Sequence, residues 1–418
     1  MIRSASRPQL SARIALVLVF LVGMRGALYR LRIQFGPVGG SFLDDRPTQV
    51  AFFVIYAAAT ALGFRALRPP MSRRTLIPLI PLIPLVALLI VLVASSLWSI
   101  EAGRTLGQSL QLVAGTAAVY VLVSGLDEGE SHRALLIAGT VATAVSVVAV
   151  ALGWEWSTDG RGRMTGVFFN RNALGMVACS TLFAAIVWSL QRRRDHRAAF
   201  VAALIGASAL VVWWRTGSAT GMVAAVSGIF ASAWVVVRQR STGRLRRVIG
   251  IAPMVAVLGV LALVAARGTV TRWIGREPTL TGRTDTWDVI IEAWYRRPAL
   301  GFGFFAGWFD PEVRAGLRVI GFNHWEAHNG YLEVLFGAGL LGVAALAWFL
   351  GAVGREIVGH LDDARAPWWT GSFVFFLVAN VGETNIAANR FVWFVLVAVV
   401  VEISSARRSS PPDLAVTD

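Results

Sequence analysis

Two histidines in a long polar segment, 267–330, are the residues of this sequence best suited to acid–base chemistry. His324 and His328 stand four positions apart, and the whole sequence holds five histidines. A neutral imidazole accepts a proton near physiological pH, so His328, which precedes Asn329, is the candidate general base. The spacing would also suit metal ligation on a helix, with Glu326 close by. Because no third ligand is evident, we expect no metal and no cofactor; ordinary loop histidines are the alternative.

Arginines are the second group with chemical potential, because separate polar connections each supply one. Arg283 follows Gly282 early in segment 267–330, and Arg171 and Arg215 lie in two shorter connections. A planar guanidinium can bind two phosphate oxygens at once, which suits it to hold a diphosphate. The alternatives are a local ion pair of Arg283 with a nearby aspartate, and simple placement of the other two arginines at a membrane interface.

Composition indicates what kind of element must position these side chains. Hydrophobic residues make up 56% of the 418 positions, and the mean hydropathy is +0.63. A soluble domain is usually about 45–50% apolar, and apolar runs of about twenty residues recur along this chain, which indicates a membrane protein. All basic residues are arginines, and the net charge is +15. Because these arginines lie mainly between apolar runs, we interpret them as topological signals and expect no nucleic-acid partner.

The apolar runs predict an all-α integral membrane protein, embedded in the lipid bilayer, with about twelve membrane-crossing helices. The first run contains Arg25. The third contains Pro78, Pro81 and Pro84 near its start, where a helix tolerates proline best. The predicted helix cores are 14–29, 50–64, 76–97, 106–123, 134–152, 172–190, 198–213, 220–237, 248–266, 331–353, 368–381 and 391–404.

The placement of arginine between these helices predicts their orientation. With the N-terminus in the cytoplasm, the arginine-rich connections RALRPPMSRR, QRRRDHR and RQRSTGRLRR all fall on the cytoplasmic side, which agrees with the positive-inside rule. Both termini are then cytoplasmic, and segment 267–330 is one large extracytoplasmic loop between the ninth and tenth helices. We predict a single multi-pass cell-membrane domain over 1–406 and a polar, disordered tail over 407–418.

Four sequence blocks, taken in order, resemble the O-antigen ligase and O-antigen polymerase superfamily of polytopic membrane glycosyltransferases. The blocks are LWSIEAGRTLGQSLQL (97–112), GVFFNRNALGMV (166–177), GRTDTWDVIIEAWYRRPALGFGFFAGW (282–308) and AHNGYLEVLFGAGLLG (327–342). The last two are similar to the family's Gly-Arg…Trp…Pro…Gly-x-Gly and His-Asn…Leu…Gly blocks, and together they are the specific signal. The resemblance in architecture covers most of the chain.

The resemblance implies glycan transfer at the outer face of the cell membrane, within cell-envelope polysaccharide biosynthesis. The donor would be a glycan on undecaprenyl diphosphate, and a hydroxyl of a glycan, lipid or protein acceptor would attack its anomeric carbon. His328 would activate the acceptor. Arg283, Arg215 and Arg171 would hold the diphosphate without a metal. The supporting residues would be Gly282, Trp287, His324, Asn329 and Glu333.

The chain departs from the family pattern in several places. The family often has an arginine at the position of Ala219, and Arg215, one helical turn earlier, would stand in for it. Arg171 replaces the proline of the family's Asn-Pro-Asn element. Gly337 aligns with a position that is often acidic, for which Glu333 is the nearest substitute. These changes are compatible with a divergent substrate or with lost activity.

Three other interpretations stay open. A polymerase would have the same fold as a ligase but would transfer the glycan to another lipid-linked repeat unit, and the sequence favours the ligase-like family without separating the two. A transporter or flippase is a different class; such proteins usually bury ionisable residues at mid-membrane and often contain inverted repeats, whereas the predicted helix centres here are almost free of charge. An inactive scaffold is suggested by Ala219.

Overall fold

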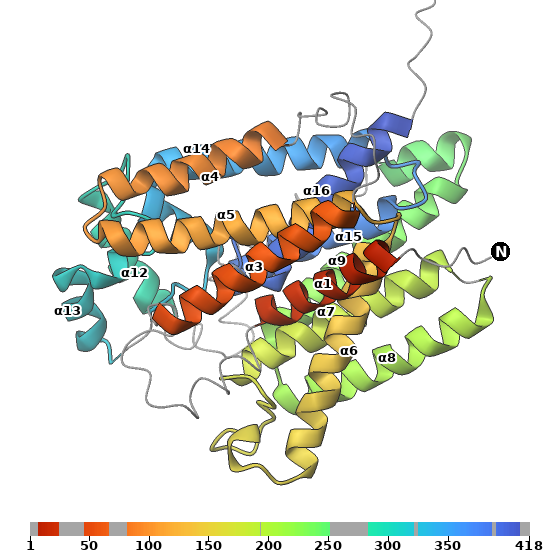
Figure 1. Cartoon of the computed structure of the whole chain (residues 1–418), viewed down its shortest axis with the longest axis horizontal. Coiled ribbons are helices and arrows are strands. Elements are labelled where there is room, and N and C mark those ends of the chain that lie inside the picture. The colour runs from red at the N-terminus through yellow and green to blue at the C-terminus, as the bar shows by residue number, and fades with distance from the viewer. Residues whose placement is uncertain are drawn as a thin grey trace, which may run out of the picture.

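The computed structural model describes residues 7–24, 46–66, 82–192, 194–250, 283–321, 325–386 and 390–409. Within these ranges the chain is helical and no strand occurs; the β-type pairing found there is an isolated bridge between Thr158 and Met164. Figure 1 shows the long helices packed alongside one another, with the two short helices α12 and α13 together at one end. The predicted all-α class is confirmed for the part of the chain that the structure describes.

The described helices fall into longer and shorter elements. The long helices are α1 (Arg7–Met24), α3 (Arg46–Ala66), α4 (Leu82–Ala94), α5 (Ala102–Ser124), α6 (Glu130–Ala151), α7 (Arg171–Gln191), α8 (His196–Thr216), α9 (Ala219–Arg240), α14 (Gly330–Gly359), α15 (Ala366–Gly382) and α16 (Phe391–Ser409). The shorter elements are α12 (Arg283–Tyr295), α13 (Pro311–Val319) and the 3₁₀ turns η2 (Ser95–Leu97), η3 (Glu155–Ser157) and η4 (Gly307–Phe309).

Eight helices of the described ranges are long and apolar enough to cross a membrane, and two further apolar helices, Leu82–Leu97 and Phe391–Ala406, are shorter. Every predicted core overlaps residues described as helical, although for the core 248–266 these are 248–250 alone. Residues 251–266 lie outside the described ranges, so a total of about twelve spans stays a prediction.

Some predicted cores overlap the described helices only in part. Helix α1 is described from Arg7 to Met24, so it begins earlier than the predicted core 14–29, and residues 25–29, with Arg25, lie outside the described residues. Helix α4 is described from Leu82 to Ala94 and contains Pro84, while residues 76–81 of the predicted core, with Pro78 and Pro81, lie outside the described residues. Helix α16 is described to Ser409, past the predicted core 391–404 and into the first residues of the predicted tail. The rest of the predicted tail lies outside the described residues.

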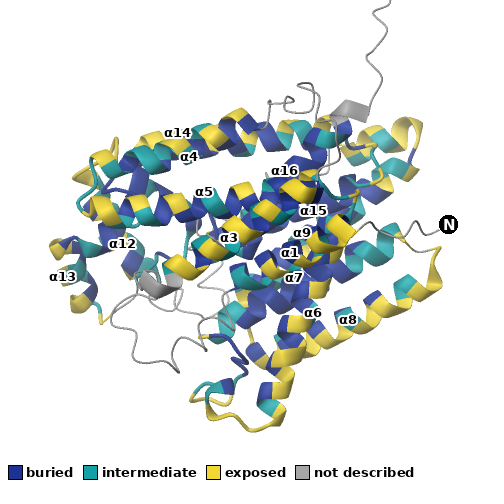
Figure 2. Ribbon diagram, in the orientation of Figure 1, coloured by how far each residue is buried: buried dark blue, intermediate teal, exposed yellow. Residues whose placement is uncertain are grey.

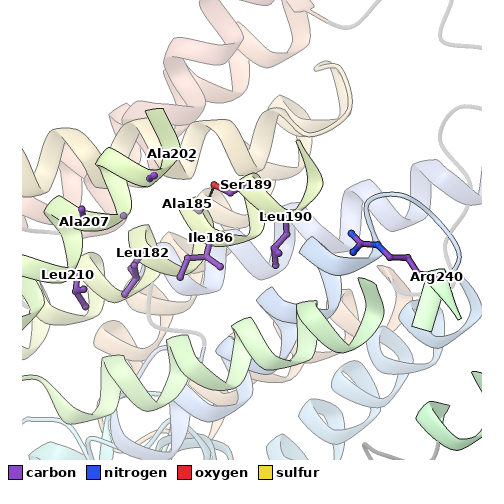
Figure 3. Close-up of a pocket in the computed structure, with 11 residues that line it drawn as sticks. Leu182, Ala185, Ile186, Ser189, Leu190, Ala202, Ala207, Leu210 and Arg240 are labelled. Carbon is purple, nitrogen blue, oxygen red and sulfur yellow. Dashed lines mark hydrogen bonds between the residues drawn. The ribbon is translucent and has the colours of Figure 1, made fainter. Parts of the chain in front are cut away.

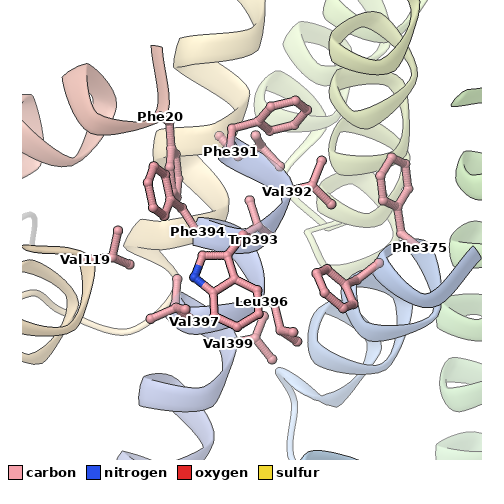
Figure 4. Close-up of a cluster of buried hydrophobic side chains, with 14 of the residues drawn as sticks. Phe20, Val119, Phe375, Phe391, Val392, Trp393, Phe394, Leu396, Val397 and Val399 are labelled. Atoms are coloured by element: carbon pink, nitrogen blue, oxygen red, sulfur yellow. The ribbon is translucent and has the colours of Figure 1, made fainter. Parts of the chain in front are cut away.

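Helix α16 lies at the centre of the molecule, and nearly all its side chains between 391 and 406 are buried. Figure 4 shows Trp393, Phe394 and neighbouring apolar residues packed among the surrounding helices. The indole Nε1 of Trp393 donates a hydrogen bond to Thr116 Oγ1 on α5, at 3.0 Å. Figure 2 shows exposed residues along the outer faces of α3 and α8 instead. Residues 391–401 of this helix are all apolar, and a segment that is apolar all round belongs in such an interior position.

Small residues let α15 approach α9 closely. A Cβ atom on Gly228 would lie 2.9 Å from the carbonyl oxygen of Gly371, and one on Gly371 would lie 2.8 Å from that of Gly228. At the end of α15, a Cβ on Gly382 would lie 2.7 Å from Thr220 Oγ1, at the start of α9. This close packing of helices through glycine is typical of membrane proteins, and here it fixes where α15 ends.

The predicted loop 267–330 is largely structured where it is described. Helices α12 and α13 enclose a small apolar cluster that includes Ile290, Trp308 and Leu317. The glycine-rich run 301–303 lies against the backbone of α14: Phe302 N–H donates to Phe336 O at 3.1 Å, and Gly303 N–H donates to Gly337 O at 2.8 Å. The small residues of both runs allow this close backbone approach.

Candidate functional site

Five charged or titratable side chains gather where the polar ends of three helices meet. Helix α12 begins with Arg283, His328 lies just before α14, and Glu383 caps the end of α15. Glu326 lies two residues before His328, and Arg390 lies just before α16. We call these residues, Arg283, Glu326, His328, Glu383 and Arg390, the charged cluster. It joins segments that are up to about a hundred residues apart in the sequence.

His328 has an unusual backbone conformation that is fixed from its C-terminal side. Its φ angle is +50°, in the left-handed region that non-glycine residues seldom adopt. The next residue, Asn329, caps α14: its side-chain Oδ1 accepts hydrogen bonds from Tyr331 N–H at 3.0 Å and Leu332 N–H at 3.1 Å. Strain of this kind persists where the surroundings hold it in place, and it recurs at functional sites.

The His328 ring lies between two carboxylates. Its Nδ1 is 3.3 Å from Oε2 of Glu383 and 3.4 Å from Oε1 of Glu326. Burial by itself lowers the pKa of His328, but the hydrogen bond to Glu383 and the charges of both carboxylates outweigh that effect and the opposing charge of Arg283. The net result is a pKa above the ordinary histidine value. The ring therefore stays protonated to a higher pH than an isolated histidine.

Arg283 shares a carboxylate with His328. Its guanidinium donates to the carbonyl oxygen of Gly382, and its Nη2 lies 3.2 Å from Oε1 of Glu383. The side chains of Arg283 and Glu383 are 18% and 9% exposed, so the pair is mostly shielded from solvent. The local ion pair with a neighbouring aspartate that the sequence allowed is not formed. Arg283 and His328, predicted from different sequence blocks, thus lie on either side of one carboxylate.

Glu326 has an arginine partner of its own. Arg390 donates a hydrogen bond from Nη2 to Oε2 of Glu326, and both side chains are about one-fifth exposed. The backbone carbonyl of Arg390 accepts from Trp393 N–H at 3.0 Å and Phe394 N–H at 3.2 Å, which begins α16. The cluster therefore contains two carboxylates and two guanidiniums around one imidazole.

Three side chains of the charged cluster, Glu326, His328 and Glu383, are close enough together to be considered as a metal site. One ligand atom from each of Glu326, His328 and Glu383 lies within 4.8 Å of the others. Each carboxylate, however, already faces a guanidinium, and a cation placed between them would lie beside Arg283 and Arg390. The charges of two acids and two arginines cancel without an ion. The arrangement fits an ion-pair network better than a metal site.

Arg171 lies near the cluster, and Arg215 does not share its contacts. The Nη1 of Arg171 donates to the carbonyl oxygens of Thr216 and Gly217 at 3.1 and 3.2 Å, across the α8–α9 turn. Its guanidinium is also within electrostatic range of Arg283. Arg215 is exposed. The backbone carbonyl of Arg215 accepts a hydrogen bond from Met164 N–H at 3.0 Å, and among described residues this is the contact that Arg215 makes outside its own helix.

The predicted supporting residues have structural contacts around the site. Trp287 donates from Nε1 to Ala327 O at 2.9 Å. Glu333 is 2% exposed; its carboxylate accepts from Trp308 Nε1 at 2.6 Å and from Ala327 N–H at 2.9 Å. Trp287 and Glu333 thus hold residue 327, next to His328. Gly282 and His324 lie outside the described residues. Residues 325–329 are not helical, so a helical metal-binding pair is not supported.

Sequence reasoning missed Glu383 and Arg390 as site residues, and it considered Glu326 only as a possible metal ligand. Glu383 and Arg390 belong to GETNIAANR, the connection between the last two predicted helices. A signal was present, because the predicted topology puts this polar connection on the same side as segment 267–330. A charged pair in a short connection between two apolar helices could therefore have been matched with Arg283 and His328.

A groove of about 420 Å³ lies elsewhere, along the second half of α7. Figure 3 shows Leu182, Ile186 and Leu190 of α7 facing it, with Leu210 of α8 nearby and Arg240 toward one end. None of its lining residues belongs to the charged cluster. Apart from Arg240 and Ser189 the groove is lined by apolar side chains, so it offers no acid–base group and is separate from the charged cluster.

Comparison with known proteins agrees with the sequence blocks. A family model described as O-antigen ligase matches residues 207–347, a range that includes Arg215, Arg283 and His328. The chain is also similar to a protein named "Exopolysaccharide production protein ExoQ" from Rhizobium meliloti (strain 1021). The two are 25% identical over 325 residues, which cover 68% of this chain and 73% of that protein.

These matches, together with the apolar helices, indicate the class of protein: a multi-pass membrane protein similar to proteins of polysaccharide biosynthesis. More narrowly, the chain is similar to the O-antigen ligase family over residues 207–347, and the relative named ExoQ extends the similarity to about two thirds of the chain. The resemblance predicted from the motif blocks is thereby confirmed. The matched range ends before α15, so Glu383 and Arg390 lie outside it.

Proposed function

We propose that this protein is a membrane glycosyltransferase that moves a glycan from a lipid diphosphate to an acceptor hydroxyl at the outer face of the cell membrane. The donor class is a glycan on undecaprenyl diphosphate. The single observation that best supports the proposal is the contact of His328 and Arg283 with the same carboxylate of Glu383. A proton acceptor and a phosphate-binding group side by side are what this reaction requires.

In the proposed reaction, His328 takes the proton of the acceptor hydroxyl as its oxygen attacks the anomeric carbon. A new carbon–oxygen bond forms, and the bond from that carbon to the diphosphate oxygen breaks, so the lipid diphosphate leaves with the electron pair. Arg283 stabilises the negative charge that develops on the leaving group. Arg171, across the α8–α9 turn and within electrostatic range of Arg283, supplies further positive charge.

Arg171 is a better second arginine for the diphosphate than Arg215 in this proposal. The sequence pattern suggested that Arg215 replaces the arginine missing at Ala219. Arg171, however, reaches the turn directly before Ala219, through Thr216 and Gly217. A guanidinium anchored on those carbonyls brings positive charge to the turn before Ala219, which makes the inactive-scaffold interpretation less favoured.

Among acceptors, another lipid-linked glycan is a second candidate, which would make the protein a polymerase. The relative named for exopolysaccharide production favours this possibility. Mass spectrometry of a strain lacking the gene would separate the two. Accumulated lipid-linked single repeats would indicate a polymerase, and long lipid-linked chains without their final acceptor would indicate a ligase. An unchanged glycan profile would favour a transporter or a scaffold.

The direct test is His328→Ala, assayed as purified full-length protein in liposomes with EDTA present throughout. The substrate is the lipid-linked oligosaccharide that accumulates in the deletion strain. Losing a general base should lower the transfer rate by about 10²–10⁴-fold, while expression and membrane insertion remain normal. Near-normal product from this variant would refute the role of His328. Dependence of the wild-type rate on an added divalent cation would refute metal-independent transfer.

A further inference from the structure

We propose that Glu383 is a positioning residue of this site, which holds the base and the diphosphate-binding arginine in register through its two carboxylate oxygens. The proposal rests on the proposed function and adds a residue to it that lies outside the family match. Oε1 of Glu383 lies 3.2 Å from Nη2 of Arg283, and Oε2 lies 3.3 Å from Nδ1 of His328. One side chain thus bridges two groups that lie in α12 and before α14.

The backbone around Glu383 is firmly anchored. Its N–H donates to Ala379 O at 3.0 Å, which ends α15. Asn380, which is fully buried, accepts from Asn385 N–H at 2.9 Å and Ile386 N–H at 2.7 Å through its side-chain oxygen. Its own amide donates to Phe376 O at 2.7 Å. The turn that carries Glu383 is therefore tied to the last turns of α15.

The same asparagine fixes α15 against α14, and hence against His328. A Cβ atom on Gly330 would lie 2.3 Å from Asn380 Oδ1, so the start of α14 touches the polar end of α15. Tyr331 adds a hydrogen bond from its hydroxyl to Leu377 O at 2.8 Å. Glu383 and His328 are thus held by two elements in direct contact, and a carboxylate on such a support can orient a ring.

Contact at Nδ1 determines which nitrogen does the chemistry. A carboxylate at 3.3 Å favours the tautomer with hydrogen on Nδ1, so the lone pair of the neutral ring lies on Nε2. Nε2 is then the atom that takes the acceptor proton. The imidazolium that forms carries its charge between Glu383 and Glu326, which stabilises it.

Glu383 differs from Glu326 in what it connects. Glu326 lies two residues from His328 and pairs with Arg390, so it joins the histidine to the start of α16. Glu383 joins the histidine to Arg283 through its other carboxylate oxygen. Removing Glu383 should therefore disturb both the base and the anion-binding group.

The pH profile tests this role. In the wild type, both carboxylates raise the pKa of His328, while burial and Arg283 lower it. The base must be neutral to act, so the rate rises with pH through this pKa. In Glu383→Gln one raising charge is lost, so the acid limb should move to lower pH. The plateau rate should fall about 10- to 100-fold, as is typical when an orienting partner is lost.

The experiment compares the wild type, Glu383→Gln, Glu383→Asp and Glu292→Gln in liposomes, with the lipid-linked oligosaccharide from the deletion strain as substrate. Glu292 is exposed on α12, so its substitution should leave the profile unchanged. Glu383→Asp keeps the charge but shortens the reach, so it should lower the plateau and keep the acid limb near the wild-type position. If Glu383→Gln does not fold, Glu383→Asp still tests the positioning role.

The outcomes separate this proposal from the one on which it rests. A shifted acid limb with a lower plateau in Glu383→Gln supports the positioning role. A wild-type profile in Glu383→Gln overturns it, and so does a plateau in Glu383→Asp equal to that of the wild type. If His328→Ala still makes product, the proposed function itself fails. If His328→Ala is inactive but both Glu383 variants behave like the wild type, only the positioning role fails.

Discussion

At the scale of single residues, the site is a set of charges that satisfy one another. His328 contacts two acids, and each acid contacts an arginine. Removing one member of a mostly buried network leaves its partner's charge uncompensated, which usually costs more than the pair contributes. The types of residue at positions 283 and 328 therefore matter beyond their charge, because each must keep its partners and meet the substrate.

Arg283→Lys tests whether the shape of the cation matters. The guanidinium of Arg283 reaches Gly382 O and Glu383 together, and a diphosphate would need the same planar fork. Lysine keeps the charge but presents a single ammonium. We expect the transfer rate to fall about 100-fold, as for loss of a donor that stabilises developing charge. The control is Arg318→Lys on exposed α13. Full activity in Arg283→Lys would argue against bidentate recognition.

At the scale of secondary-structure elements, the site depends on where α14 and α15 meet. Asn329 begins α14 and Glu383 ends α15, so small shifts of either helix would separate the base from its carboxylate. The position of α15 depends in turn on the glycine contact with α9. Packing deep in the bundle therefore determines geometry at the polar end.

Gly371→Ala tests this dependence. Its Cβ would lie 2.0 Å from Ser232 Oγ and 2.8 Å from Gly228 O, so α15 must move away from α9. Overpacking of this kind typically costs about 1–3 kcal/mol. We expect a lower thermal unfolding temperature in detergent and a lower transfer rate. Gly351→Ala is the matched control, because a Cβ there meets nothing within 4 Å. Equal unfolding temperatures for the two variants would contradict the proposed contact.

At the scale of the whole molecule, polar residues gather at the helix ends, on two opposite sides of the predicted membrane. Arg283, His328 and Glu383 lie at the ends of their helices that meet in the cluster. The predicted orientation places this side outside the cell, and the arginine-rich connection after α9 inside. A reaction on a lipid-linked glycan facing outward requires that orientation.

Cysteine labelling of intact cells tests the orientation. Ala315 is exposed on α13, so Ala315→Cys should react with a membrane-impermeant maleimide from outside. Thr242→Cys, exposed after α9, should react only after permeabilisation. The native Cys179 is buried and provides the unlabelled background. Labelling of position 315 only in permeabilised cells would invert the topology and remove the basis for an outer-face reaction.

The sequence by itself determined the class of fold and most helix positions, and it singled out Arg283 and His328 as candidate site residues. Apolar runs of membrane-spanning length leave a chain few alternatives to helices, because backbone groups in lipid must bond within their own segment. Arg283 and His328 were found because each occurs in a specific local block. Helix ends were less accurate, as at α14, which continues to Gly359 beyond the predicted 353, because helix ends depend on local caps and tertiary packing as well as on hydropathy.

Only the tertiary structure decided which residues complete the site. Glu383 and Arg390 are ordinary charged residues in a short connection, and nothing local to them indicates a partner about a hundred or sixty residues away. Their contacts with Arg283 and Glu326 follow from how α15 packs on α9 and meets α14. That packing depends on how glycine and asparagine fit at particular positions along the helices. The periodicity of hydrophobic residues does not specify this fit.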